Sequence, residues 1–106
     1  MLFRSADIAA RAGTPTYVYS AAAIRSTWRR FDAAFASVSH QVHYALKANS
    51  TLALLRVLRG LGSFADANSW GEIEVALRAG FTPERLVFTG VGKTADELRQ
   101  IGRAHV

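Results

Sequence analysis

The spacing of apolar and polar residues predicts an amphipathic helix in the first third of the chain. Four large apolar residues recur at intervals of four, three and four residues, which places their side chains on one face of an α-helix. They are Ile24, Trp28, Phe31 and Phe35. Arginines stand on the other face, and Ser20 precedes the stripe as an N-cap residue. A helix with a buried apolar face is therefore expected after Ser20.

Beyond that helix, short strands and helices are expected in strict alternation. The predicted strands are residues 41–47, 64–68 and 85–89, which are apolar or alternating and are bounded by polar or glycine residues. A leucine repeat over residues 52–61 marks the first intervening helix, and capping boxes open the next two at Ser69 and Thr94. Gly80 is the expected stop of the middle helix. Strands separated by helices in this way run parallel.

The predicted fold class is α/β, with three βα units of an incomplete (β/α)8 barrel. A strand at residues 16–19 and the helix after Ser20 would precede these units. Closing such a barrel takes eight units and about 250 residues, and this chain has 106. The chain is therefore expected to be a fragment. The alternative is a self-contained three-stranded α/β domain, which would leave both edges of the sheet unpaired.

Composition narrows the possible partners. The formal net charge is +5, but the basic residues are scattered, which does not favour a nucleic-acid surface. Nucleic acid is therefore not expected as a partner. No apolar stretch reaches the roughly 18 residues of a membrane helix, so a membrane is not expected as a partner either. The sequence has no cysteine, which excludes disulfides and thiolate metal sites and is compatible with the cytoplasm.

Lys47 is the leading candidate for chemistry. It is predicted to be the last residue of the first barrel strand, where it would share a face with His43 and Ala45. Active sites of (β/α)8 barrels lie at the carboxyl ends of the strands. On position alone, such a lysine is more often an ordinary solvated charge.

The residues around Lys47 carry a more specific signal. Residues 44–50 read Tyr-Ala-Leu-Lys-Ala-Asn-Ser, which closely resembles the Tyr-Ala-x-Lys-Ala-Asn run of the fold-type III ornithine, diaminopimelate and arginine decarboxylase family. The resemblance continues through Asp66, Asn68, residues 71–73 and residues 87–94. The Gly-Val-Gly-Lys turn at residues 90–93 is closer to the diaminopimelate type than to the ornithine type.

The resemblance implies pyridoxal 5'-phosphate as the cofactor and a Schiff base on Lys47. It places Asp66 near the cofactor, level with Lys47 on the neighbouring strand. It further implies decarboxylation of meso-2,6-diaminopimelate to L-lysine in lysine biosynthesis, by a cytoplasmic homodimer acting on a small amino-acid substrate. Residues 1–20 would then join a following β-domain, and residues 21–106 would begin the cofactor-binding barrel.

Other activities of the same family stay open as alternatives. The substrate is alternatively ornithine, arginine or another basic amino acid, or the protein is a non-catalytic homologue that binds the cofactor. The fragment alone is expected to be inactive, because most cofactor ligands of the family follow later in the chain. Phe64 and Trp70 replace glycines that are common in the diaminopimelate type, which puts substrate preference in doubt.

Two other candidate sites fail on the residues themselves. The run Gly92-Lys93-Thr94 suggests a nucleotide-binding loop, but the first glycine of that motif would stand at position 87, which is Val87. His40 and His43 are expected on opposite faces of a strand, so no metal site is predicted. The serines have no histidine and aspartate partners at a spacing that would indicate a hydrolase triad.

Overall fold

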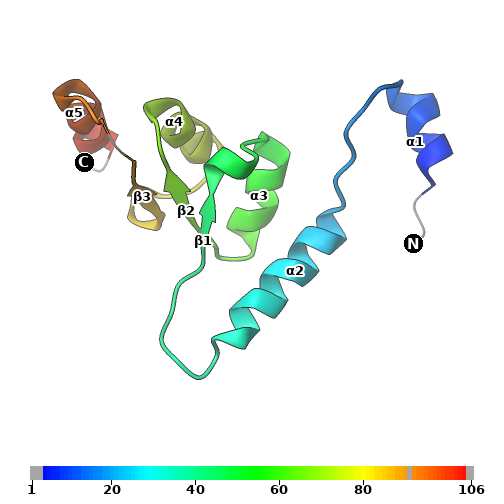
Figure 1. Cartoon of the computed structure of the whole chain (residues 1–106), viewed down its shortest axis with the longest axis horizontal. Helices are drawn as coiled ribbons and strands as arrows, with labels where there is room; N and C mark the ends of the chain where they lie inside the picture. Colours follow the sequence, from blue (N-terminus) through cyan, green and yellow to red (C-terminus); the bar gives the residue numbers. More distant parts are fainter. Residues whose placement is uncertain (1–3, 91, 105–106) are drawn as a thin grey trace.

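The computed structural model of the protein describes residues 4–90 and 92–104. Its elements follow the predicted alternation from residue 43 onward (Figure 1). The helices are α1 (Ser5–Ala12), α2 (Ala21–Ala34), α3 (Leu52–Gly60), α4 (Trp70–Ala79) and α5 (Ala95–Ala104), the strands are β1 (His43–Ala45), β2 (Phe64–Ala67) and β3 (Leu86–Phe88), and the 3-10 turns are η1 (Leu46–Ala48) and η2 (Pro83–Arg85).

The three strands form one parallel sheet in the order β1-β2-β3, as the alternation predicted. Tyr44 pairs with Ala65, and Ala65 pairs with Leu86. Asp66 pairs with Ala45 on one side and with Val87 on the other. Because paired residues of parallel strands point to the same side, this register assigns every strand residue to one of two faces.

One face of the sheet is covered by helices and is called here the helix face. It carries Tyr44, Ala65, Ala67, Leu86 and Phe88. Ala65 and Ala67 are fully buried in a core that includes Leu55 and Leu58 of α3 and Ile73 and Ala76 of α4. Small alanines in the central strand let α3 and α4 approach the sheet closely.

The opposite face is called here the open face. It carries His43, Ala45, Phe64, Asp66 and Val87, none of which is buried. Val87 is 41% exposed, whereas its neighbours Leu86 and Phe88 pack against the core. In a closed (β/α)8 barrel the face away from the helices lines the interior, so the open face is where the site is expected.

The predicted helix ends are confirmed. The side chain of Ser20 accepts a hydrogen bond from the backbone of Ala23 at 3.2 Å, and α2 begins at the next residue. Ser69 caps α4 in the same way, and Gly80 ends that helix with a left-handed φ of 102°. An L side chain rarely adopts this backbone conformation, so glycine suits the position.

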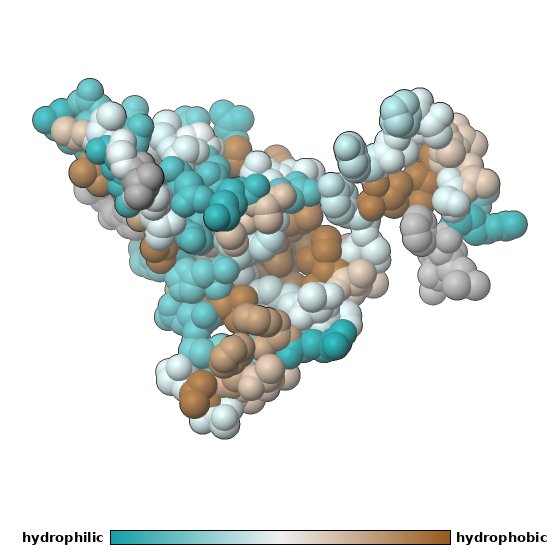
Figure 2. Space-filling view, viewed as in Figure 1, coloured by the Kyte–Doolittle hydropathy of each residue, from teal (hydrophilic) through white to brown (hydrophobic). Residues whose placement is uncertain are grey.

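The expected burial of the α2 stripe is only half correct. Ile24 and Trp28 are half-buried beside the core, but Phe31 and Phe35 are 56% and 44% exposed. Among the described elements α2 packs chiefly on α3, so the C-terminal end of the stripe extends past its partner. A groove of about 540 Å³ lies between α2 and β1. Apolar residues gather at the surface near this end of α2, at the bottom of Figure 2.

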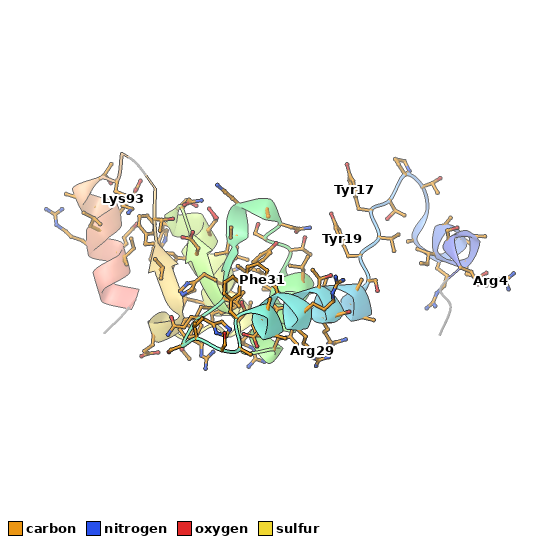
Figure 3. The ribbon with its side chains drawn as sticks, turned by 60° about the horizontal axis from the view of Figure 1, so that its bottom comes forward. Arg4, Tyr17, Tyr19, Arg29, Phe31 and Lys93 are labelled. Atoms are coloured by element: carbon orange, nitrogen blue, oxygen red, sulfur yellow. The ribbon has the colours of Figure 1, made fainter. Side chains whose placement is uncertain are left out.

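The strand expected at residues 16–19 is not formed. This segment is extended but has no strand beside it, and Tyr17 is 90% exposed and Tyr19 57%. Both side chains project to the same side of the segment, as alternate residues of an extended chain do (Figure 3). A strand needs a hydrogen-bonded neighbour, and the described residues supply none here. Helix α1 beyond it was not predicted.

No helix in the described part of the chain has the length and apolar character to cross a membrane.

Candidate active site at the carboxyl ends of the strands

Lys47 lies in the turn η1 and not at the end of the strand, so the sequence prediction was wrong by two residues. β1 ends at Ala45, and the next residue, Leu46, begins the turn η1 and is buried in the core at 1% exposure. Lys47 is carried over the carboxyl end of the sheet on this anchored turn, and it is exposed. The position still lies where (β/α)8 barrels carry their active sites.

A hydrogen-bonded brace holds the turn that carries Lys47. The hydroxyl of Tyr44 donates to the backbone carbonyl of Asn49 at 2.7 Å, which spans the turn from one side to the other. The Asn49 side-chain oxygen accepts from the backbone and hydroxyl of Thr51, at 3.0 and 2.6 Å, where α3 begins. Burial raises the pKa of the Tyr44 hydroxyl, so it remains a protonated donor at neutral pH.

Asp66 lies on the open face of the central strand. It pairs with Ala45 and therefore lies two residues below Lys47, not level with it as predicted. One carboxylate oxygen, Oδ1, accepts a hydrogen bond of 2.6 Å from the hydroxyl of Thr89, which follows β3. The same hydroxyl lies 2.8 Å from the side-chain oxygen of Asn68. The structure thus brings three polar side chains together at the carboxyl ends of β2 and β3.

Glu72 lies beside this group in the first turn of α4. Its Oε2 accepts from the backbone of Asn68 at 3.3 Å, while the Ser69 hydroxyl accepts from the backbone of Glu72 at 3.2 Å. The Ser69 half of the predicted capping box is thus formed, while the return bond of Glu72 reaches the backbone of Asn68, one residue before the cap. The other oxygen, Oε1, is buried and has no hydrogen-bond partner in the described part of the chain.

Phe64 and Trp70 have separate roles. Phe64 lies at the amino end of the open face, with the His43 ring 5.1 Å away and the Arg85 guanidinium 4.9 Å above its centroid. It therefore forms a floor two residues below Asp66. Trp70 is half-buried and packs against the core. It is the first residue of α4, and this packing ties its side chain to the helix face.

Lys47 and Lys93 are the two lysines of the sequence, and their settings differ. The Lys93 ammonium donates to the carbonyl of Phe88 at 3.1 Å and lies 4.7 Å above the Phe88 ring, so this side chain folds back onto β3 (Figure 3). Lys93 is therefore not a freely solvated loop residue. Within the described residues the Lys47 ammonium has no hydrogen-bond or ion-pair partner.

The arrangement suits an aldehyde cofactor held by an amine. An exposed primary amine on a braced turn is accessible to a carbonyl carbon, and Ala45 leaves space beneath it on the open face. The carboxylates of Asp66 and Glu72 supply negative charge nearby, which favours protonated nitrogen. The residues present therefore fit pyridoxal phosphate on the Lys47 side of the sheet.

A comparison with protein families identifies the family. The profile of the pyridoxal-dependent decarboxylase family, pyridoxal binding domain, matches residues 21–106. The chain belongs to this family. Its cofactor is pyridoxal phosphate, as the resemblance at residues 44–50 implied.

Individual relatives agree with this assignment. Diaminopimelate decarboxylase of Pseudomonas aeruginosa is 50% identical over 93 residues, which cover 88% of this chain and 22% of that protein. The structure of diaminopimelate decarboxylase from Helicobacter pylori complexed with L-lysine superposes with a TM-score of 0.90 at 39% identity, covering 97% of this chain and 26% of that one. Lysine decarboxylase from Selenomonas ruminantium gives 0.85 at 26% identity, covering 98% and 28%.

The chain thus spans about a quarter of the length of these relatives. The superpositions confirm the predicted fold class, a part of a pyridoxal-phosphate-binding barrel. Sequence reasoning missed the contact between Thr89 and Asp66. Alternation in the sequence places Thr89 on the same face as Val87, but the pairing of Val87 with Asp66 is visible only in the strand register of the structure.

Proposed function

We propose that Lys47 binds pyridoxal 5'-phosphate covalently and that the full-length protein decarboxylates meso-2,6-diaminopimelate to L-lysine. The observation that carries the proposal is the Lys47 amine, exposed on a braced turn at the carboxyl end of β1 and without a partner in the described residues. The identity to diaminopimelate decarboxylases supports the substrate, and the H. pylori relative was solved with L-lysine bound.

The proposed roles divide between the chain and the cofactor. Bound pyridoxal phosphate supplies an electron sink for the electron pair that departing carbon dioxide leaves behind. Lys47 would hold the cofactor through its ζ-nitrogen, and the same amine, when free, would move a proton. Asp66 would supply negative charge on the open face, near the Lys47 turn that would hold the cofactor. The floor at Phe64 limits how deeply a ligand enters that face.

Further features of the proposal concern the complete protein. We propose that it is a homodimer in the cytoplasm, as the family resemblance implies, and the absence of cysteine is compatible with that compartment. The exposed apolar segment around Tyr17 and Tyr19 would pair with a following β-domain, which would supply the strand partner that residues 16–19 lack here. Residues 1–106 alone are expected to release no carbon dioxide.

The test compares Lys47→Arg with Lys93→Arg in the full-length product of the open reading frame. Borohydride reduction fixes a lysine-bound cofactor as a stable amine, and peptide mass spectrometry then locates it. We expect the label on Lys47, its loss in Lys47→Arg, and a fall in carbon dioxide release of at least about a thousandfold. Lys93→Arg should keep both. A label on any other lysine would refute the proposed role of Lys47.

The substrate is tested by comparing diaminopimelate with ornithine, arginine and lysine. The preferred substrate is the one with the highest kcat/KM. Preference for a basic monocarboxylic amino acid would favour the alternative decarboxylases, a type to which the S. ruminantium relative belongs by name. Cofactor on Lys47 without carbon dioxide release from any of the four would indicate a non-catalytic homologue.

A further inference from the structure

The contact between Thr89 and Asp66 joins two strands at the candidate site. Thr89 continues the sheet beyond β3, because its backbone N–H donates to the carbonyl of Ala67 at 2.9 Å. The sheet itself therefore fixes the backbone of Thr89. Gly90 follows with a φ of 119°, a conformation that glycine adopts without strain, and the chain leaves the sheet there. The side chain of Thr89 thus starts from a backbone held by the sheet, and its hydroxyl is held by Asp66.

The hydrogen atoms in this group can be assigned from its chemistry. The Thr89 hydroxyl has one proton and lies near two oxygens, Oδ1 of Asp66 at 2.6 Å and Oδ1 of Asn68 at 2.8 Å. A carboxylate can only accept, so the proton points to Asp66. The oxygens of Thr89 and Asn68 would then face each other without a proton between them and repel. Turning the Asn68 amide by half a turn exchanges its oxygen and nitrogen without changing its shape. The amide nitrogen of Asn68 therefore belongs on the Thr89 side, where it donates to the hydroxyl.

This assignment gives a directed chain of donors that ends on Asp66. Asn68 donates to Thr89, and Thr89 donates to one oxygen of the carboxylate. The other carboxylate oxygen, Oδ2, has no hydrogen-bond partner among the residues that the structure describes. One oxygen of Asp66 is held while the second stays available on the open face. A hydrogen bond to a charged group is also stronger than one between neutral groups.

We propose that Thr89 is a positioning residue, which holds the Asp66 carboxylate so that its free oxygen faces the cofactor. The inference rests on the proposed function at Lys47, and it adds a residue of the third strand to that site. Thr89 itself would touch neither substrate nor cofactor. Its effect passes through Asp66, and Asn68 orients the hydroxyl.

The test uses Thr89→Val, which removes the hydroxyl and keeps the shape, and Thr89→Ser, which keeps the hydroxyl. In the full-length protein we expect Thr89→Val to weaken binding of pyridoxal phosphate to the apoprotein about tenfold. Thr89→Ser should restore most of the affinity. Thr82→Val is the matched control, because the Thr82 side chain makes no capping hydrogen bond, and it should leave the affinity unchanged.

Two further measurements separate positioning from a general structural role. In an Asp66→Ala background, Thr89→Val should cause little further loss, because both changes remove the contact between the Thr89 hydroxyl and the Asp66 carboxylate. The pH midpoint of the cofactor's visible absorbance should fall by about one unit in Thr89→Val, since a loosened carboxylate favours protonated nitrogen less. If Thr89→Val does not fold, Thr89→Ala takes its place in both measurements.

The outcomes distinguish this inference from the proposed function. Equal losses in Thr89→Val and Thr89→Ser would overturn the inference, as would the same loss with and without Asp66. In either case Lys47-dependent cofactor binding would leave the proposed function standing. A borohydride-stable cofactor label on another lysine, unaffected by Lys47→Arg, would instead overturn the proposed function itself.

Discussion

The two faces of the three-stranded sheet are built from the same short strands but are held in different ways. On the helix face Ala65 and Ala67 are fully buried. On the open face, Asp66 between them is half-buried and is held by a hydrogen bond to Thr89. Alternating residues of one strand thus separate the packing that stabilises the fold from the polar groups available for chemistry.

This difference between the two faces predicts which substitutions should lower the stability of the fold and which should weaken the candidate site. Apolar burial dominates the free energy of folding, and it is concentrated on the helix face. The open face instead combines an aromatic floor at Phe64 with polar groups nearer the carboxyl ends. We therefore expect losses of stability on the helix face and losses of cofactor binding on the open face.

The largest effect on stability is expected for Leu55→Ala. Leu55 is fully buried between α3 and the sheet, so its truncation removes apolar contacts and leaves a cavity. The free energy of unfolding, measured by urea titration of the full-length protein, should fall by about 2–5 kcal/mol. Leu98→Ala on α5 is the control, since Leu98 is 54% exposed and should lose well under half of that. Equal losses would mean that the helix face is not the main source of stability.

Much of the fold was predictable because its signals are local. The capping serines, the Gly80 stop and the leucine repeat of α3 each determine their element through contacts within one or two turns. Strand ends were less predictable. The sequence alternates through residue 47, but β1 ends at Ala45 and a 3-10 turn begins at Leu46, which alternation alone does not signal.

The site was predictable only in part. The residues around Lys47 form a continuous run, so a family resemblance could identify them from the sequence alone. The contact between Asp66 and Thr89 joins positions 23 residues apart, and its partners become clear only once the strand register is known. The prediction that Asp66 lies level with Lys47 was wrong for the same reason. Asp66 pairs with Ala45, and this strand register depends on tertiary packing.

A smaller effect is expected for Arg85→Ala at the floor of the open face. The Arg85 guanidinium lies over the Phe64 ring and donates to the carbonyl of Gly62 at 2.8 Å. Exposed cation–π contacts contribute about 0.5–1 kcal/mol, so the free energy of unfolding should fall by roughly that amount. Arg56→Ala, at an exposed position of α3, should change it less. A loss as large as that of Leu55→Ala would erase the contrast between the two faces.

The smallest effect on stability is expected outside the sheet, where a side-chain contact joins α2 to the segment before β1. His40 Nε2 is 2.7 Å from Oδ1 of Asp32 on α2, and His40 Nδ1 is 2.9 Å from the carbonyl of Val38. Both neighbours are acceptors, so only the imidazolium, which donates from both nitrogens, satisfies both contacts. The hydrogen bond to the Val38 carbonyl makes the larger contribution and the hydrogen bond to Asp32 the next, and both raise the pKa of His40 above 6.5.

A raised native pKa means that the contribution of His40 to stability is fully present below pH 6.5 and is lost as pH rises through the native value. The difference in unfolding free energy between the wild type and His40→Gln should therefore stay constant below about pH 6.5 and shrink as the pH rises above that value. The control is His43→Gln, because His43 contacts the Gln41 side chain and the Phe64 ring on the open face and lies away from the His40 contact. This variant keeps the contact between His40 and Asp32, so the pH dependence that the contact confers should be retained. A wild-type advantage over His40→Gln that grows with pH would show that the imidazolium does not hold α2.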